Sequence, residues 1–187
     1  MRELSLNLLD IAENSVKAGA TLVILDLFVQ GNVLTMRVTD DGCGMTDEFV
    51  ARVRDPYTTT RKTRKVGMGI PLLAMTAEMS GGTFAIDSEV GRGTVVTATF
   101  AVDHIDRPPL GDVASTFVTL MTDSVINGTK PVDFVLNYGV GGTQFSVDTR
   151  DLRAELEGIG LDNPEVMRFV KDLITGNMEE INGGMSI

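Results

Sequence analysis

Two pairs of strand-like runs, each joined by a short turn, limit the folds open to the first half of this chain. The runs are rich in apolar and β-branched residues and cover residues 21–29, 33–39, 83–88 and 94–102. Helix-like segments cover residues 4–18, 46–54 and 68–79. The order helix, hairpin, helix, loop, helix, hairpin predicts an α/β fold. We expect a two-layer sandwich with a mostly antiparallel sheet that helices cover on one face.

The residues after this pattern predict a second, smaller α+β unit. Pro108 and Pro109 indicate a linker, so we divide the chain into residues 1–105 and 106–187. The second unit should contain helices at 113–126, 151–157 and 164–180 and strands at 133–138 and 143–148. Asn163 should cap the last helix, with Pro164 at its first position. The role of this unit stays open, with docking of a partner as one option.

Composition excludes several classes of protein. The 187 residues carry a net charge of −10, which argues against a nucleic-acid or anionic-membrane surface. The single cysteine, Cys43, excludes an internal disulfide framework and a cysteine zinc cluster. No signal peptide and no apolar run of membrane-spanning length is present. A soluble cytoplasmic protein is therefore the default expectation.

Three glycine-bearing segments come in a fixed order along the first half. They are residues 40–45 (DDGCGM), 67–70 (GMGI) and 91–94 (GRGT). One such segment alone is weak evidence, because glycine pairs occur in many loops. The ordered set, with Asp10 and Asn14 on the preceding helix, predicts a nucleotide pocket.

Polar side chains at these positions match the parts of a nucleotide. A carboxylate at Asp40 can accept a hydrogen bond from an exocyclic amine, which favours adenine over guanine; the alternative is an acidic turn that ends a strand. Asn14 offers a neutral oxygen to Mg²⁺. Asp10, one helical turn earlier, could polarise water, act as a base toward a hydroxyl or hold a magnesium-bound water. For both helix residues the alternative is an exposed polar face.

Glycines and basic residues are the candidates for binding the phosphates of a nucleotide. Gly67 and Gly69 introduce a helix whose free N–H groups and dipole favour phosphate, although a simple turn into a helix is the alternative. For residues 91–94 we expect a hairpin turn more than direct contact with the ligand; a functional role would be to let the sheet pass close beneath the nucleotide. The loop at residues 56–66 carries Arg61, Lys62, Arg64 and Lys65. It could close over a triphosphate or be an ordinary solvated loop.

These motifs together resemble those of the GHKL ATPases, the superfamily of DNA gyrase, heat-shock chaperone ATPases, histidine kinases and mismatch-repair ATPases. Residues 10–15 (DIAENS) with 17–20 (KAGA) resemble its N box, and residues 40–45 its G1 box. Residues 55–60 (DPYTTT) look like the F box of histidine kinases, and residues 67–70 look like the G2 box. The resemblance covers roughly residues 1–102 and implies the Bergerat ATP-binding fold.

The resemblance implies ATP and Mg²⁺ as cofactors and a set of site residues. Asn14 would hold the metal and Asp40 the adenine amino group, while Asp10 is the candidate catalytic residue. Glycines would shape the base pocket (Gly42, Gly44) and hold phosphates at the lid hinge (Gly67, Gly69). The remaining candidate nucleotide-binding residues are Lys17, Met45, Thr59, Met68, Ile70 and Thr94.

Two departures from the histidine kinases shape the expected function. The ATP-binding segment starts at residue 1, so we expect no preceding helical hairpin with a phosphoacceptor histidine. Position 10 is Asp, where histidine kinases usually have Asn, and a carboxylate favours hydrolysis or hydroxyl phosphorylation. We expect a magnesium-dependent ATP-binding regulatory protein, a slow ATPase or ATP-dependent switch that acts on an unidentified protein partner.

Two alternatives stay open beside this reading: a serine/threonine kinase of the anti-sigma-factor type and a non-catalytic ATP-binding module. The motifs do not decide whether the chain is an enzyme. If it is one, we expect an ATPase or a protein kinase of the GHKL type. The expected partners are ATP, ADP and the protein partner or substrate, with a homodimer as a further option. We expect no nucleic-acid or membrane partner.

Overall fold

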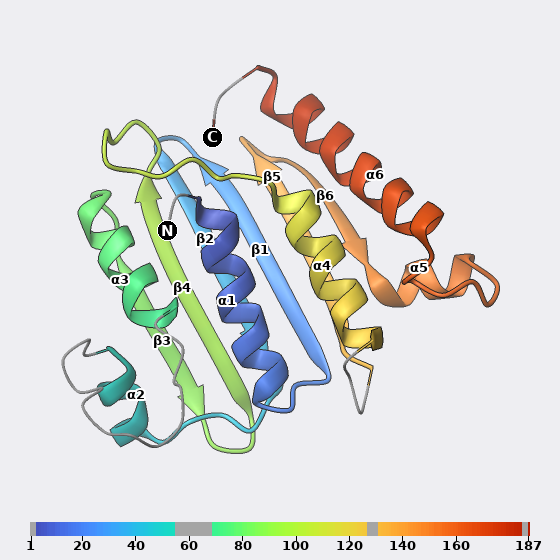
Figure 1. Cartoon of the computed structure of the whole chain (residues 1–187). Coiled ribbons are helices and arrows are strands. Elements are labelled where there is room, and N and C mark those ends of the chain that lie inside the picture. Colours follow the sequence, from blue (N-terminus) through green and yellow to red (C-terminus); the bar gives the residue numbers. More distant parts are fainter. Residues whose placement is uncertain (1–2, 55–68, 127–130, 185–186) are drawn as a thin grey trace.

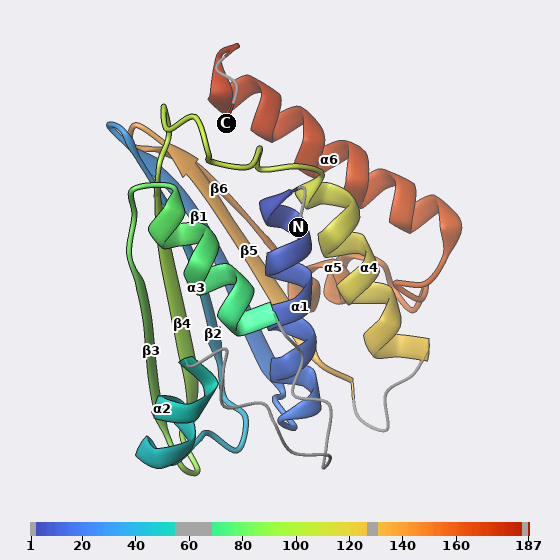
Figure 2. The same cartoon turned by 60° about the vertical axis from the view of Figure 1, so that its left-hand side comes forward.

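A single sheet of six strands runs through the structure, with helices over one of its faces (Figures 1 and 2). The computed structural model describes residues 3–54, 69–126, 131–184 and 187. The strands are β1 (Leu22–Gln30), β2 (Val33–Asp40), β3 (Phe84–Glu89), β4 (Gly93–Ala101), β5 (Asp133–Val140) and β6 (Thr143–Asp148). The helices of the described part are α1 (Leu4–Lys17), α2 (Asp47–Arg54), α3 (Gly69–Met79), α4 (Val113–Ile126), α5 (Thr149–Glu155) and α6 (Pro164–Asn182).

The strand order in the sheet is β3-β4-β2-β1-β5-β6. All neighbours are antiparallel except β1 and β5, which pair in parallel from Leu22 opposite Asp133 to Val29 opposite Val140. The predicted fold class, an α/β sandwich with a mostly antiparallel sheet, is confirmed. The division at residue 105 stays a prediction, and the strands that follow it extend the sheet of the first half.

Local signals place the ends of several helices where the sequence predicts them. Asn163 accepts a hydrogen bond from the backbone N–H of Glu165 at 2.8 Å, and Pro164 is the first residue of α6. The hydroxyl of Thr46 accepts from the N–H of Phe49 at 3.3 Å, just before α2. Gly19 follows α1 with φ +78°, a conformation that glycine adopts without strain. The predicted basic loop at residues 56–66 lies outside the described residues.

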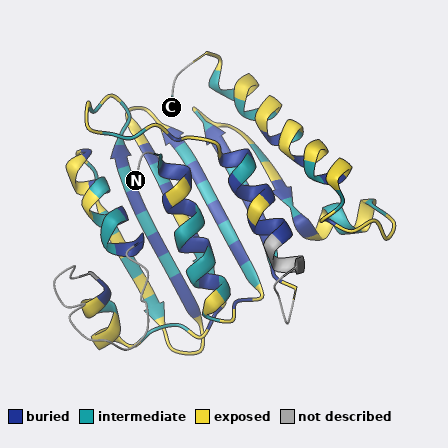
Figure 3. Cartoon of the chain, viewed as in Figure 1, coloured by how far each residue is buried: buried dark blue, intermediate teal, exposed yellow. Residues whose placement is uncertain are grey.

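Helix α1 lies across the middle of the sheet, between α3 and α4 (Figure 1). Its apolar side buries Leu4, Leu8 and Ile11. The strand beneath it alternates, so that Leu25 and Leu27 of β1 are fully buried while their neighbours are only partly covered. Each fully buried leucine contributes about 1.5–3 kcal/mol of transfer free energy. Figure 3 shows the same division along the strands and the exposed outer sides of the helices.

None of the described helices combines the length and the apolar character that crossing a membrane requires.

A carboxylate just after β2 ties this strand to the start of β1. Asp41 accepts hydrogen bonds from the backbone N–H groups of Thr21 and Leu22 at 2.7 and 2.9 Å, and from the Thr21 hydroxyl. Partial burial raises the pKa of Asp41, but these hydrogen bonds to the charged form outweigh it, so the pKa lies below its usual value. The beginning of the loop that follows β2 is thereby fixed to the start of β1.

Replacing this carboxylate should destabilise the fold in a pH-dependent way. Because the folded pKa is lowered, the stabilisation by Asp41 is complete above its unfolded value of about 3.9 and is lost as pH falls through the folded value. We expect Asp41→Asn to lower the free energy of unfolding by about 1 kcal/mol at pH 7, with the difference from wild type shrinking in acid. Urea denaturation at several pH values measures this. Asp87→Asn, at an exposed position of β3, is the control. A pH-independent difference for Asp41→Asn would contradict the assignment.

Candidate functional site

Four segments that are distant in sequence meet at one end of the sheet. They are the second half of α1, the end of β2, the turn between β3 and β4, and the first residue of α3. This end lies at the bottom of Figure 1. It brings together Asp10, Asn14, Asp40 and the first glycine-bearing segment, as the sequence predicts for a nucleotide pocket.

Asp40, the last residue of β2, is held by two donors. The hydroxyl of Ser15 in α1 donates to Oδ2 at 2.6 Å, and the backbone N–H of Gly42 donates to Oδ1 at 2.9 Å. An ionised carboxylate has about four lone-pair sites, so two remain for a ligand. The carboxylate is therefore fixed in orientation and still able to accept.

The backbone of the loop after Asp40 is hydrogen-bonded to the neighbouring segments. The N–H of Cys43 donates to the carbonyl of Ala18 at 2.9 Å, and the carbonyl of Cys43 accepts from the N–H of Gly91 at 2.9 Å. The N–H of Met45 donates to Oγ of Ser88 at 2.8 Å. These bonds clamp the loop between the end of α1 and the β3–β4 turn.

Close backbone contacts explain two of the glycines. Gly44 has φ +66°, and a Cβ there would lie 2.0 Å from the carbonyl oxygen of Glu89. Gly93 has φ +112°, and a Cβ there would lie 1.9 Å from the carbonyl oxygen of Asp40. No side chain fits at either position. Both glycines therefore serve the close packing of the loop on the β3–β4 hairpin.

Thr94 lies opposite Asp40 in the sheet, and its hydroxyl is already engaged. Ser88 gives its single proton to the carbonyl of Gly93 at 2.9 Å, so the Thr94 hydroxyl is the donor in the 2.9 Å contact between the two side chains. Thr94 is 9% exposed. The Thr94 hydroxyl could therefore accept a hydrogen bond from a ligand but not donate one.

Asp10 and Asn14 lie one turn apart on α1, and both are partly buried. Neither side chain forms a hydrogen bond with another described residue. Gly69, the first residue of α3, lies against Asp10: a Cβ on it would be 2.9 Å from Cβ and 3.2 Å from Oδ2 of Asp10. The start of α3 thus meets the carboxylate face of α1.

Burial is the main cause that raises the pKa of Asp10 above its usual value. The negative charge of Glu13 adds to the increase, and the positive charge of Lys17 opposes it. Lys17 is largely exposed and forms an ion pair with Glu13 at 2.9 Å. In this arrangement its ammonium group is directed along the outer side of α1.

The other predicted site residues divide into two groups. Ile70 is buried in α3, and Met45 is partly buried against the core, so both offer apolar surface. Thr59, Gly67 and Met68 lie outside the described residues. Sequence reasoning assigned no role to Ser15 or Ser88, although a serine on the apolar stripe of α1 was a usable signal.

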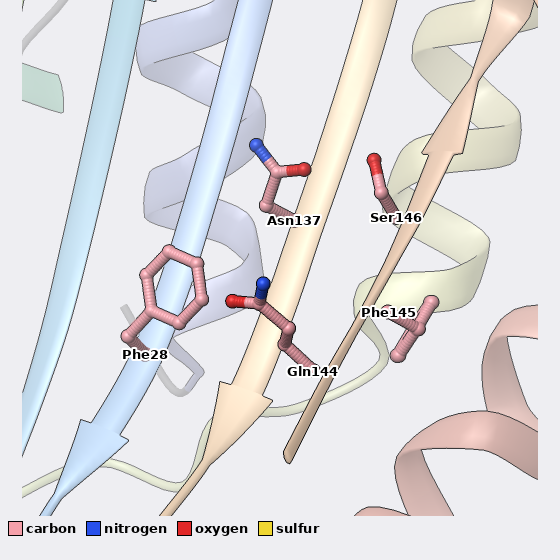
Figure 4. A pocket seen from close by; sticks show the side chains of 5 residues that line it. All are labelled: Phe28, Asn137, Gln144, Phe145 and Ser146. Carbon is pink, nitrogen blue, oxygen red and sulfur yellow. The ribbon is translucent and has the colours of Figure 1, made fainter. Parts of the chain in front are cut away.

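No group of three or more His, Cys, Asp or Glu side chains in the described part of the chain is placed to hold a metal. A hollow of about 410 Å³ is found elsewhere, on the sheet face away from α1 (Figure 4). Phe28, Asn137, Gln144, Phe145 and Ser146 line it. The amide of Asn137 is bonded to Asp26 at 2.8 Å. This hollow is separate from the site around Asp40.

Several sensor proteins and kinases are similar in sequence to part of this chain. Sporulation kinase B of Bacillus subtilis is 26% identical over 103 residues, which are 55% of this chain and 24% of the relative. The cell-division control histidine kinase PdhS of Brucella anthropi is 28% identical over 113 residues, covering 54% and 11%. The C4-dicarboxylate transport sensor protein DctS of Rhodobacter capsulatus is 35% identical over 78 residues, covering 42% and 12%. The chain thus spans under a quarter of the length of these relatives.

A solved structure described as the N-terminal domain of a DNA repair protein shares the fold. It superposes with a TM-score of 0.52 at 11% identity, over 79% of this chain and 52% of the other. The family model for histidine kinase-, DNA gyrase B- and HSP90-like ATPases matches residues 1–104, which hold every element of the site. Together with the order of Asn14, Asp40 and the glycine segments, this match shows that the chain belongs to the GHKL family of histidine kinase-like ATPase domains.

Proposed function

We propose that this chain binds ATP with Mg²⁺ at the Asp40 end of the sheet and is a regulatory protein, a slow ATPase or ATP-dependent switch that acts on a protein partner. The observation that carries the proposal is the Asp40 carboxylate, fixed by Ser15 and Gly42 with lone pairs left over. The family match over residues 1–104 supports it.

Asp40 suits adenine because it can only accept hydrogen bonds. The 6-amino group of adenine donates, whereas guanine presents a carbonyl oxygen at the same position, which a carboxylate repels. Discrimination against a base that leaves a buried polar group unpaired is strong. The apolar surface of Ile70 and Met45 suits the face of a base.

The described residues fit Mg²⁺ with its usual preference for oxygen ligands and retained water. The carboxamide of Asn14 has no described partner and would supply one oxygen, with phosphate oxygens and waters completing the set. The ion would neutralise charge on the phosphates. Gly69 and Ile70 open α3, and their backbone N–H groups would favour phosphate at the positive end of the helix dipole.

Asp10 favours hydrolysis over simple binding. Its carboxylate lies against the start of α3, one helical turn from Asn14, where it could accept a proton from an attacking water. Transfer to a protein hydroxyl is the second candidate, because the relatives are named as kinases and the same base would serve a serine or threonine.

We further propose that the protein partner docks on residues 106–187.

Asp40→Asn should weaken ATP binding at least tenfold, since the new amide presents a donor where the base also donates. Calorimetric titration with ATP and Mg²⁺ measures the affinity, and circular dichroism checks the fold. Asp87→Asn, on exposed β3, should bind as wild type does. Equal affinity in Asp40→Asn and wild type would refute the assignment of Asp40.

Asp10→Asn should lower ATP turnover by about 100-fold or more while changing ATP affinity little, because it removes a base but keeps the size of the side chain. Phosphate release and transfer of label from radioactive ATP to protein are measured together. Label on a protein would favour the kinase, and free phosphate the hydrolase. Unchanged turnover in Asp10→Asn would exclude Asp10 as the base. If the wild-type protein left ATP intact, the non-catalytic ATP-binding module would be favoured.

A further inference from the structure

Ser15 is a polar residue on the apolar stripe of α1. It continues the spacing of Leu4, Leu8 and Ile11 and is only 3% exposed. A buried hydroxyl without a partner costs free energy, so its hydrogen bonds account for its presence. Two acceptors lie within reach of Oγ: the backbone carbonyl of Ile11 at 3.3 Å and Oδ2 of Asp40 at 2.6 Å.

A hydroxyl has one proton and can donate it fully to one acceptor only. The contact with Asp40 is shorter, and its acceptor carries a charge, so it is the stronger of the two. The other carboxylate oxygen is bonded to the N–H of Gly42. Asp40 is therefore held from two sides, by a helix and by its own loop. This leaves the carboxyl group little freedom to rotate about its bond to Cβ.

We propose that Ser15 is a positioning residue for adenine recognition, holding the Asp40 carboxylate so that its free lone pairs meet the 6-amino group of the base. The proposal rests on ATP binding at Asp40. Ser15 acts through Asp40 and contacts no part of the nucleotide itself. Its effect is accordingly confined to ligands that have a 6-amino group.

Without the Ser15 hydroxyl, Oδ2 of Asp40 loses its donor from α1. The carboxylate can then turn, and ordering it again on binding weakens the affinity for ATP. A purine riboside triphosphate that lacks the 6-amino group makes no bond to Asp40. Its affinity depends on the phosphates, the metal and the apolar surface, which the loss of Ser15 leaves in place.

The test compares two nucleotides and three proteins by calorimetry in the presence of Mg²⁺. Ser15→Ala should weaken ATP binding about 5–20-fold and purine riboside triphosphate binding less than twofold. Ser5→Ala is the matched control: Ser5 lies on the same helix, is 1% exposed, and its hydroxyl makes only a 3.4 Å contact with Glu3. Both affinities should be unchanged in that variant.

Ser15→Cys gives a second route to the same result, because its thiol is close in size and a weak donor. It should reduce ATP affinity selectively as well. Equal weakening of both nucleotides, or no change in either, would overturn the positioning role. Failure of the wild type to bind ATP would instead overturn the proposed function, so the two failures are told apart by the wild-type titration.

Discussion

The apolar stripe of α1, buried against the middle of the sheet, supports both the fold and the site. Leu4, Leu8 and Ile11 are removed from water there, and α3 and α4 pack on either side of the helix. The same helix carries Asp10, which lies against the start of α3, and Asn14 one turn further along. Substitutions that create a cavity under α1, such as Leu8→Ala at about 2–5 kcal/mol, would therefore disturb the core and the site together.

Backbone contacts, more than side chains, hold the segments of the site together. The loop after β2 hydrogen-bonds to α1 on one side and to the β3–β4 turn on the other, and Gly44 and Gly93 allow the backbones to approach. A rigid surrounding loop keeps Asp40 in one place. In the adenine site that we propose, less ordering is then left to binding, which favours discrimination between bases by a single carboxylate.

The second half of the chain is tied to the first through hydrogen bonds of the sheet. Strand β5 pairs in parallel with β1, and β6 continues beyond it, so the residues after the family match share its sheet. Tyr138 of β5 is fully buried, with its hydroxyl bonded to Asn182 of α6 at 2.5 Å. Helix α6 is thus attached to the strand beside β1.

Most helices and strands followed from local patterns, because apolar periodicity, helix caps such as Asn163 and turn glycines depend on neighbouring residues. The order of Asn14, Asp40 and the glycine segments likewise predicted the family. Pairing between strands that are distant in the sequence did not follow in the same way. Any strand offers the same backbone donors and acceptors, so the sequence of β5 does not name β1 as its partner.

The sequence by itself determined the elements, the family and the polar residues available for nucleotide chemistry. Only the tertiary structure decided how those residues act on one another. Ser15 and Asp40 are 25 positions apart, and their 2.6 Å contact exists because the core packing of α1 sets the helix at the end of β2. Contacts between distant segments depend on where the whole core places them, and no local pattern contains that information.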